Sequence, residues 1–193
     1  RMTINDIEKI IKDFIQYKGI TPVIFIDYMQ IIAPIDVHYT DKQNMDEVVD
    51  RLKQISVEQD TPVVAISSYN RDNYYEPANV SAFKESGAID YGADYIMALQ
   101  YKGIDEIYYD NDKRKTEQQK KREIYELIED LKLKSNQGEP IPIEFKMLKG
   151  RNSGKFNMVF KFKARYGYFT EDTYKASVKD TNYSAKKVAT PLN

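Results

Sequence analysis

The sequence has no cysteine, no tryptophan and one histidine. Without cysteine, a disulfide framework and a thiolate metal site are both excluded. His38 alone cannot form a zinc site or a histidine-based catalytic triad, so we interpret it as a solvated loop residue. No apolar run approaches the roughly 20 residues that cross a bilayer, and the N-terminus lacks the pattern of a signal peptide. We therefore expect a cytoplasmic protein with no membrane partner.

The charges are distributed unevenly along a chain whose net charge is only −1. Residues 1–112 carry 10 basic and 20 acidic side chains, whereas residues 145–193 carry 11 basic and 3 acidic ones. The basic part could meet a polyanion such as nucleic acid. Such an imbalance is also common in proteins that bind no nucleic acid. The length of 193 residues suffices for one globular domain with a buried core.

The first hundred residues alternate between helical and strand patterns. Thr3 and Asp6 form a capping-box pattern before apolar residues at helical spacing, and Gly19 supplies a stop. Short apolar runs at 23–26 and 63–67 each follow a proline and predict buried strands. Between them we expect a polar loop over 33–44 and a helix over 46–59. This order predicts an α/β fold with a mostly parallel sheet and helices on both faces.

The second half of the chain changes its period. A third strand is expected at 95–99, and a charged insert over 103–138 contains a helical stripe that predicts a surface helix ending near Gly138. Apolar residues at 141–147 and 156–162 then alternate with polar ones, which predicts a C-terminal antiparallel hairpin. We expect residues 1–172 to form the domain core and residues 173–193 to form a polar tail.

Three short segments have the chemistry of a nucleotide or nucleic-acid site. Asp27 follows the first apolar strand, where a carboxylate can hold a Mg²⁺-bound water beside phosphates, although an aspartate is also a frequent turn former there. The loop from Lys84 to Gly87 could approach a phosphate with its backbone and neutralise it, but it could equally be a solvated turn. Lys149 and Arg151 could reach an anion from a hairpin tip, although exposed tips often carry such residues.

A phosphate-binding loop is absent from the sequence. The segment from Gly150 to Phe156 is only superficially similar to the pattern G-x-x-x-x-G-K-[ST]. It has three residues between its glycines, Phe156 replaces the hydroxyl that would bind Mg²⁺, and a strand follows where a helix is required. The chain offers no other candidate.

In order and spacing, four motifs resemble the C-terminal RecA-like ATPase domain of DnaB-family replicative DNA helicases. The stretch 26–32 (IDYMQII) resembles that family's I-D-Y-L-Q-L Walker B segment, and 62–71 (PVVAISSYNR) resembles its P-V-V-A-L-S-Q-L-N-R strand and turn. The segment 84–97 resembles R-E-S-G-x-I-x-x-x-A-D-x-I-M, and 148–152 (LKGRN) resembles the K-x-R-N-G hairpin. Together the motifs cover most of residues 3–170.

The resemblance implies a RecA-like fold and a role for each motif. Asp27 would be the Walker B aspartate, which serves Mg²⁺ through water, and Ser68 would lie at the nucleotide. Lys84, Glu85 and Gly87 would bind single-stranded DNA, and a turn carrying two cations would act in trans on the ATP of a neighbouring subunit. ATP and Mg²⁺ would be the cofactors, the assembly a hexamer, and primase or a helicase loader possible partners. In the turn that would act on the ATP of a neighbouring subunit, the two cations are Lys149 and Arg151.

The sequence departs from the family pattern at several points. Ser68 replaces a glutamine placed to sense the nucleotide, and Lys84 replaces arginine, which keeps the charge but loses the planar fork. The Walker A segment and the glutamate that activates water have no counterpart, so we expect this chain alone to be inactive. A non-enzymatic RecA-fold module that binds DNA or protein is the alternative. A recombinase-type ATPase is disfavoured by the segments 84–87 and 149–151.

Overall fold

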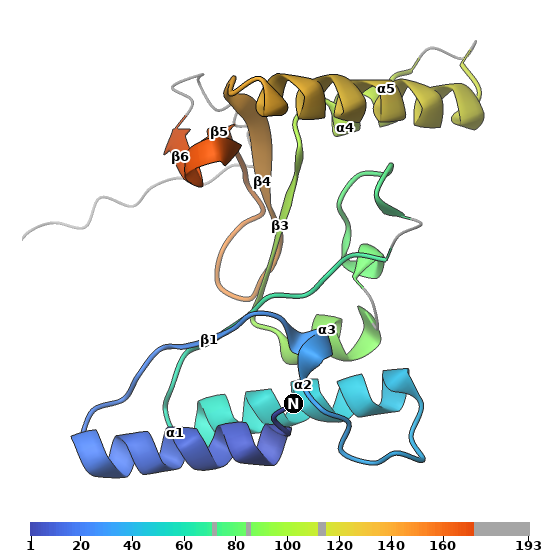
Figure 1. Ribbon diagram of the computed structural model, residues 1–193. Coiled ribbons are helices and arrows are strands. Elements are labelled where there is room, and N and C mark those ends of the chain that lie inside the picture. Colours follow the sequence, from blue (N-terminus) through green and yellow to red (C-terminus); the bar gives the residue numbers. More distant parts are fainter. Residues whose placement is uncertain (71–72, 84–85, 112–114, 172–193) are drawn as a thin grey trace, which may run out of the picture.

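The computed structural model describes residues 1–70, 73–83, 86–111 and 115–171. Its helices and strands are α1 (Ile4–Lys18), β1 (Ile24–Ile26), α2 (Asp41–Glu58), β2 (Val63–Ala65), α3 (Ser86–Gly92), β3 (Tyr95–Tyr101), α4 (Ile104–Tyr108), α5 (Glu117–Asn136), β4 (Ile141–Gly150), β5 (Asn157–Lys163) and β6 (Tyr168–Glu171). Figure 1 shows α1, α2 and α3 gathered at one end of the long β3–β4 pair, with α4 and α5 at its other end. The predicted tail at 173–193 lies outside the described residues.

Capping residues set the start of the two N-terminal helices. In α1, the Thr3 hydroxyl accepts a hydrogen bond from the Asp6 amide at 3.2 Å, and the Asp6 carboxylate accepts one from the Thr3 amide at 2.8 Å. Gly19 ends the helix with a φ of 66°, so the predicted helix and both of its ends are confirmed. The polar loop predicted over 33–44 was wrong in its last four residues. Thr40 forms a second capping box, and α2 therefore begins at Asp41.

The strands of the described residues form two sheets, and the predicted α/β fold class is confirmed. β1 and β2 are parallel, with Phe25 opposite Val64. The larger sheet is antiparallel in the order β3-β4-β5-β6. The predicted hairpin corresponds to β4 and β5, and the strand predicted at 95–99 lies in the same sheet because β3 pairs antiparallel with β4. A 3₁₀ turn over Ala164–Tyr166 leads into β6, which was not predicted.

Two separate apolar clusters stabilise the part of the chain that the structure describes. The larger one joins α1 and α2 to one face of β1–β2, with Ile4 and Ile55 almost fully buried. The smaller cluster joins α4 to α5 through Ile104, Ile124 and Ile128. The surface helix predicted within the insert is α5, and it ends two residues before Gly138.

The parallel strands are covered on one face only, so the prediction that both are fully buried was wrong. Ile26 lies in the core, but the neighbouring Phe25 side chain is 74% exposed. Val23, Val64 and Ile66 are exposed as well. Successive side chains of a strand point to opposite faces, and within the described residues α1 and α2 pack on one of these faces only.

Candidate functional site

Asp27 stands at the carboxyl end of β1. Two backbone hydrogen bonds fix this end against β2, because Ile66 donates to the Ile26 carbonyl at 2.9 Å and accepts from the Met29 amide at 2.9 Å. Asp27 itself is exposed. No hydrogen bond or ion pair engages its carboxylate within the described ranges, so it is free to hold a hydrated cation.

Gln30 joins the ends of β1 and β2. Its side-chain amide donates to the Ser67 hydroxyl at 2.9 Å, and its oxygen accepts from the Ser68 amide at 3.4 Å. The structure thus brings the predicted residues Asp27 and Ser68 to neighbouring strand ends. Sequence reasoning missed Gln30, although a polar residue between Ile26 and the following isoleucines was a usable signal.

The loop predicted to bind DNA is only partly described. Lys84 and Glu85 lie outside the described residues. Gly87 is exposed near the start of α3, and a Cβ added to it would meet no atom of the described residues within 4 Å. The backbone at this position is therefore open to a close approach by a ligand.

Lys149 lies at the end of β4 and Arg151 directly after it, and two aspartates hold this Lys149–Arg151 turn. The Arg151 amide donates to the Asp94 carbonyl at 3.0 Å, and its guanidinium lies 3.1 Å from the Asp94 carboxylate. Lys149 donates to the Asp90 carbonyl and lies 3.7 Å from that residue's carboxylate. The hairpin tip is therefore anchored to α3 and to the residue just before β3. The side chains of Lys149 and Arg151 remain 28% and 54% exposed, respectively.

Asp94 is the centre of this anchor, and it was not singled out from the sequence. Its second carboxylate oxygen lies 2.6 Å from the ammonium of Lys53 on α2. The hydrogen bond from Lys53, together with the charges of Arg151 and Lys149, holds the pKa of the Asp94 carboxyl below its usual range. Asp94 is therefore a carboxylate at neutral pH, shared between cations from two elements.

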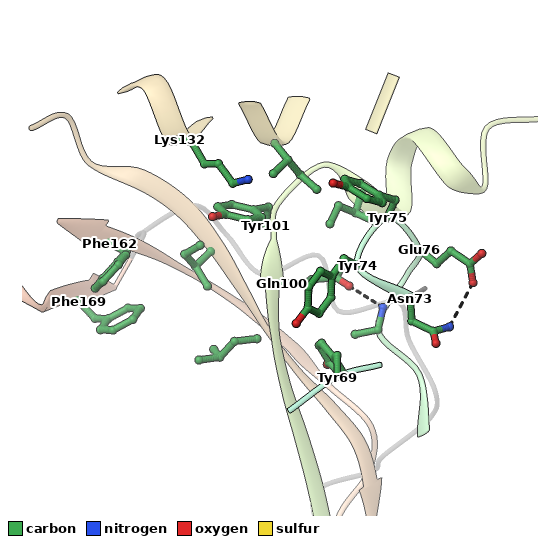
Figure 2. A pocket seen from close by; sticks show the side chains of 15 residues that line it. Tyr69, Asn73, Tyr74, Tyr75, Glu76, Gln100, Tyr101, Lys132, Phe162 and Phe169 are labelled. Carbon is green, nitrogen blue, oxygen red and sulfur yellow. Dashed lines mark hydrogen bonds between the residues drawn. The ribbon is translucent and has the colours of Figure 1, made fainter. Parts of the chain in front are cut away.

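The described residues predicted for chemistry do not line the apolar cavity that lies beside α5. That cavity, about 460 Å³ in volume, lies between α5, the end of β3 and the loop before Ala78. Figure 2 shows Tyr74, Tyr101, Phe162 and Phe169 around it, with Lys132 at its upper side. None of the predicted site residues that the structure describes is among its lining residues.

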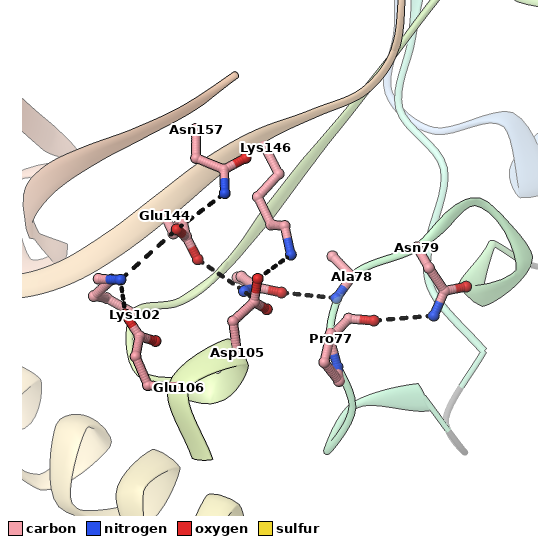
Figure 3. A network of polar contacts seen from close by, with 10 residues as sticks. Pro77, Ala78, Asn79, Lys102, Asp105, Glu106, Glu144, Lys146 and Asn157 are labelled. Carbon is pink, nitrogen blue, oxygen red and sulfur yellow. Dashed lines mark hydrogen bonds and ion pairs between the residues drawn. The ribbon is translucent and has the colours of Figure 1, made fainter. Parts of the chain in front are cut away.

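A buried polar network fastens the insert to the sheet (Figure 3). Gln100 on β3 accepts from the Ala78 amide at 2.7 Å and donates to Asp105 and Glu144, at 2.7 and 2.9 Å. Lys146 on β4 donates to Asp105 at 2.6 Å. These contacts join β3, β4 and α4, so the insert has a fixed orientation on the sheet.

Neither a metal-binding cluster nor a membrane-spanning helix is found among the described residues. Among them, no group of three or more histidine, cysteine or acidic side chains could hold a metal ion. None of their helices combines the length and apolarity that a membrane span requires.

Comparison with known proteins agrees with the architecture. A family model described as "DnaB-like helicase C terminal domain" matches residues 1–171. A solved structure described as an ATPase domain is similar, with a TM-score of 0.64 and 20% identity, over 88% of this chain and 51% of that one. A DnaB-like replicative helicase, whose structure includes interactions with primase, has a TM-score of 0.63 and 20% identity over 88% of this chain and 36% of that one. The chain thus spans about half or less of each of these two. No curated protein matches it significantly.

Proposed function

This chain belongs to the family of DnaB-like helicase C-terminal domains, and from this premise we propose that it forms the C-terminal part of the ATPase motor of a replicative helicase. The whole protein would couple ATP hydrolysis to movement along single-stranded DNA as a hexamer. One observation carries the proposal: the exposed Asp27 carboxylate and the Lys149–Arg151 turn lie on different elements, and no hydrogen bond or ion pair joins them in the described residues. Such separated halves suit a site that is completed between protomers.

Asp27 would serve the cation of the nucleotide. Its carboxylate is exposed and has no partner in the part of the chain that the structure describes, which fits a Mg²⁺ bound through water. When bound, Mg²⁺ would neutralise the phosphates of ATP. Asp27 would accept hydrogen bonds from the water of the cation, and Gln30 would hold Ser68 beside it.

Lys149 and Arg151 would act on the nucleotide of a neighbouring protomer. The Arg151 side chain is half exposed, and its planar guanidinium suits the oxygens of a phosphate. Positive groups at the transferred phosphate stabilise the charge of the transition state. The β3–β4 ladder, in which Ile96 pairs with Lys149, supplies a rigid base for this turn.

Single-stranded DNA would contact the loop at Lys84, Glu85 and Gly87. The support is the open backbone at Gly87 and the lysine that accompanies it in the sequence. Because one protomer supplies few phosphate contacts, the affinity of a single chain should be low and should fall with salt. We also propose primase or a helicase loader as a partner, since a structurally similar helicase interacts with primase.

Calorimetry with Mg²⁺ and ATP tests the nucleotide half of the proposal. The sequence contains no phosphate-binding loop, and the backbone amides and lysine of that loop normally hold the phosphates. We therefore expect this chain alone to bind ATP too weakly to measure at micromolar concentrations. Micromolar affinity would refute the view that it needs a further segment for nucleotide binding.

Fluorescence anisotropy with a labelled oligothymidylate tests the DNA half. Lys84→Ala should weaken binding at low salt and reduce its salt dependence by about one phosphate contact. Lys42→Ala is the matched control, because Lys42 is an exposed lysine on α2 and should have little effect. Equal effects of the two substitutions would refute the assignment of the loop.

A further inference from the structure

We infer that Asp94 is a positioning residue of the Lys149–Arg151 turn, which it anchors through its backbone while its carboxylate occupies the Arg151 guanidinium until a phosphate displaces it. This inference rests on the proposed function, in which the turn binds a phosphate of a neighbouring protomer. The inference adds a competing anion within the same chain. Phosphate binding would then include a step in which the Arg151 guanidinium exchanges the Asp94 carboxylate for the phosphate.

The two contacts between Asp94 and Arg151 differ in kind. The backbone bond, at 3.0 Å, extends the β3–β4 ladder by one residue beyond the pair of Tyr95 and Gly150. It does not depend on any side chain. The ion pair, at 3.1 Å, joins two side chains that are 54% and 41% exposed. The guanidinium can therefore exchange its partner while the turn keeps its place.

Lys53 keeps the carboxylate in position when the guanidinium leaves. Its ammonium lies 2.6 Å from the other carboxylate oxygen of Asp94, and it is attached to α2, which packs against the core through Leu52 and Ile55. Lys149 is held in a comparable way by Asp90, on α3. Lys149 and Arg151 are thus each paired with an aspartate on α3 or just after it.

The strength of these contacts suits an exchange. An ion pair this exposed contributes little to stability. A phosphate group carries more charge and offers the guanidinium two oxygens at once. Because the turn is already ordered, little conformational entropy is lost when the phosphate binds.

The test is binding of inorganic tripolyphosphate to the full chain, measured by calorimetry at low salt. Asp94→Asn removes the competing charge and keeps the backbone bond, so affinity should rise about three- to tenfold. Asp13→Asn is the matched control: Asp13 is exposed on α1, and its loss changes the net charge equally but should alter affinity less than about twofold.

Arg151→Gln separates the inference from the function beneath it. If Arg151→Gln leaves tripolyphosphate affinity unchanged, the turn is not a phosphate site and the proposed function of the turn fails. If it weakens binding but Asp94→Asn binds no more tightly than Asp13→Asn, only the role of Asp94 is overturned. The gain from Asp94→Asn must also vanish in an Arg151→Gln background, since a gain that survives would come from the released Lys53.

A measurement on the unaltered chain covers the case in which Asp94→Asn does not fold. Isotope labelling allows the Asp94 carboxyl carbon and the Arg151 guanidinium nitrogens to be followed by NMR during titration with tripolyphosphate. Both sets of resonances should shift along one binding curve. A shift at Arg151 without a change at Asp94 would overturn the inference.

Discussion

The polar network around Lys146 allows a quantitative test of how the insert is held. The Lys146 side chain is 10% exposed and its partner Asp105 is 24% exposed, so removing the ammonium leaves a largely buried carboxylate with fewer partners. Truncating one member of a fully buried pair costs about 3–5 kcal/mol. Because Asp105 is partly solvated and keeps the hydrogen bond from Gln100, we expect Lys146→Met to lower the free energy of unfolding by about 2–3 kcal/mol.

Urea denaturation followed by circular dichroism measures this change, and two variants calibrate it. Asp105→Asn in the Lys146→Met background removes the unpaired charge, so it should recover more than half of the loss. Lys134→Met breaks an ion pair with Asp130 in which the side chains are 47% and 52% exposed, and it should cost about 0.5 kcal/mol or less. Equal costs for Lys146→Met and Lys134→Met would refute the argument that burial makes the network important.

Three further predictions concern stability. Ile124→Ala removes a fully buried side chain from the α4–α5 cluster and should cost about 3–4 kcal/mol in urea denaturation, with a loss below about 1 kcal/mol contradicting that burial. Thr40→Ala removes the cap of α2 and should lower stability by about 1 kcal/mol, whereas Thr40→Ser should retain most of it. Hydrogen bonds from Lys12 and Arg51 lower the pKa of Glu8, so its stabilisation is complete above about pH 4.3 and is lost as the pH falls through the lowered pKa. The difference in unfolding free energy between the wild type and Glu8→Gln should therefore shrink on acidification; a constant difference would contradict this.

Local chemistry made the helices and the hairpin predictable. The Thr3 and Asp6 pair and Gly19 specified both ends of α1 through atoms within a few residues of each other. Alternation of apolar residues specified β4 and β5 in the same way. The start of α2 was missed because Thr40 and Gln43 form a capping box within a polar stretch, where no apolar period marks the first turn.

The site was predictable only in part, because its anchors depend on contacts across the fold. The positions of Asp27 and of the turn followed from strand ends and motifs. The partnership of Asp94 with Lys53 and Arg151 joins residues 41 and 57 positions apart, and no sequence period indicates such a pair. The hydrogen bond from Gln30 to Ser67 spans 37 positions, and it could not be predicted from the sequence for the same reason.

The uncovered face of β1 and β2 has a different cause. The apolar runs at 23–26 and 63–67 predicted strands buried on both sides, as parallel strands usually are, yet Phe25 and Ile66 are exposed. A run of apolar residues indicates a strand that is stable when both of its faces are covered. The residues that cover the second face need not belong to the same segment of chain. The solved ATPase domain of similar fold is a longer chain, because this chain covers 51% of it. Any segment that completes the nucleotide site beside Asp27 would therefore also be expected to bury Phe25, and substituting serine for Phe25 should weaken its association with this chain.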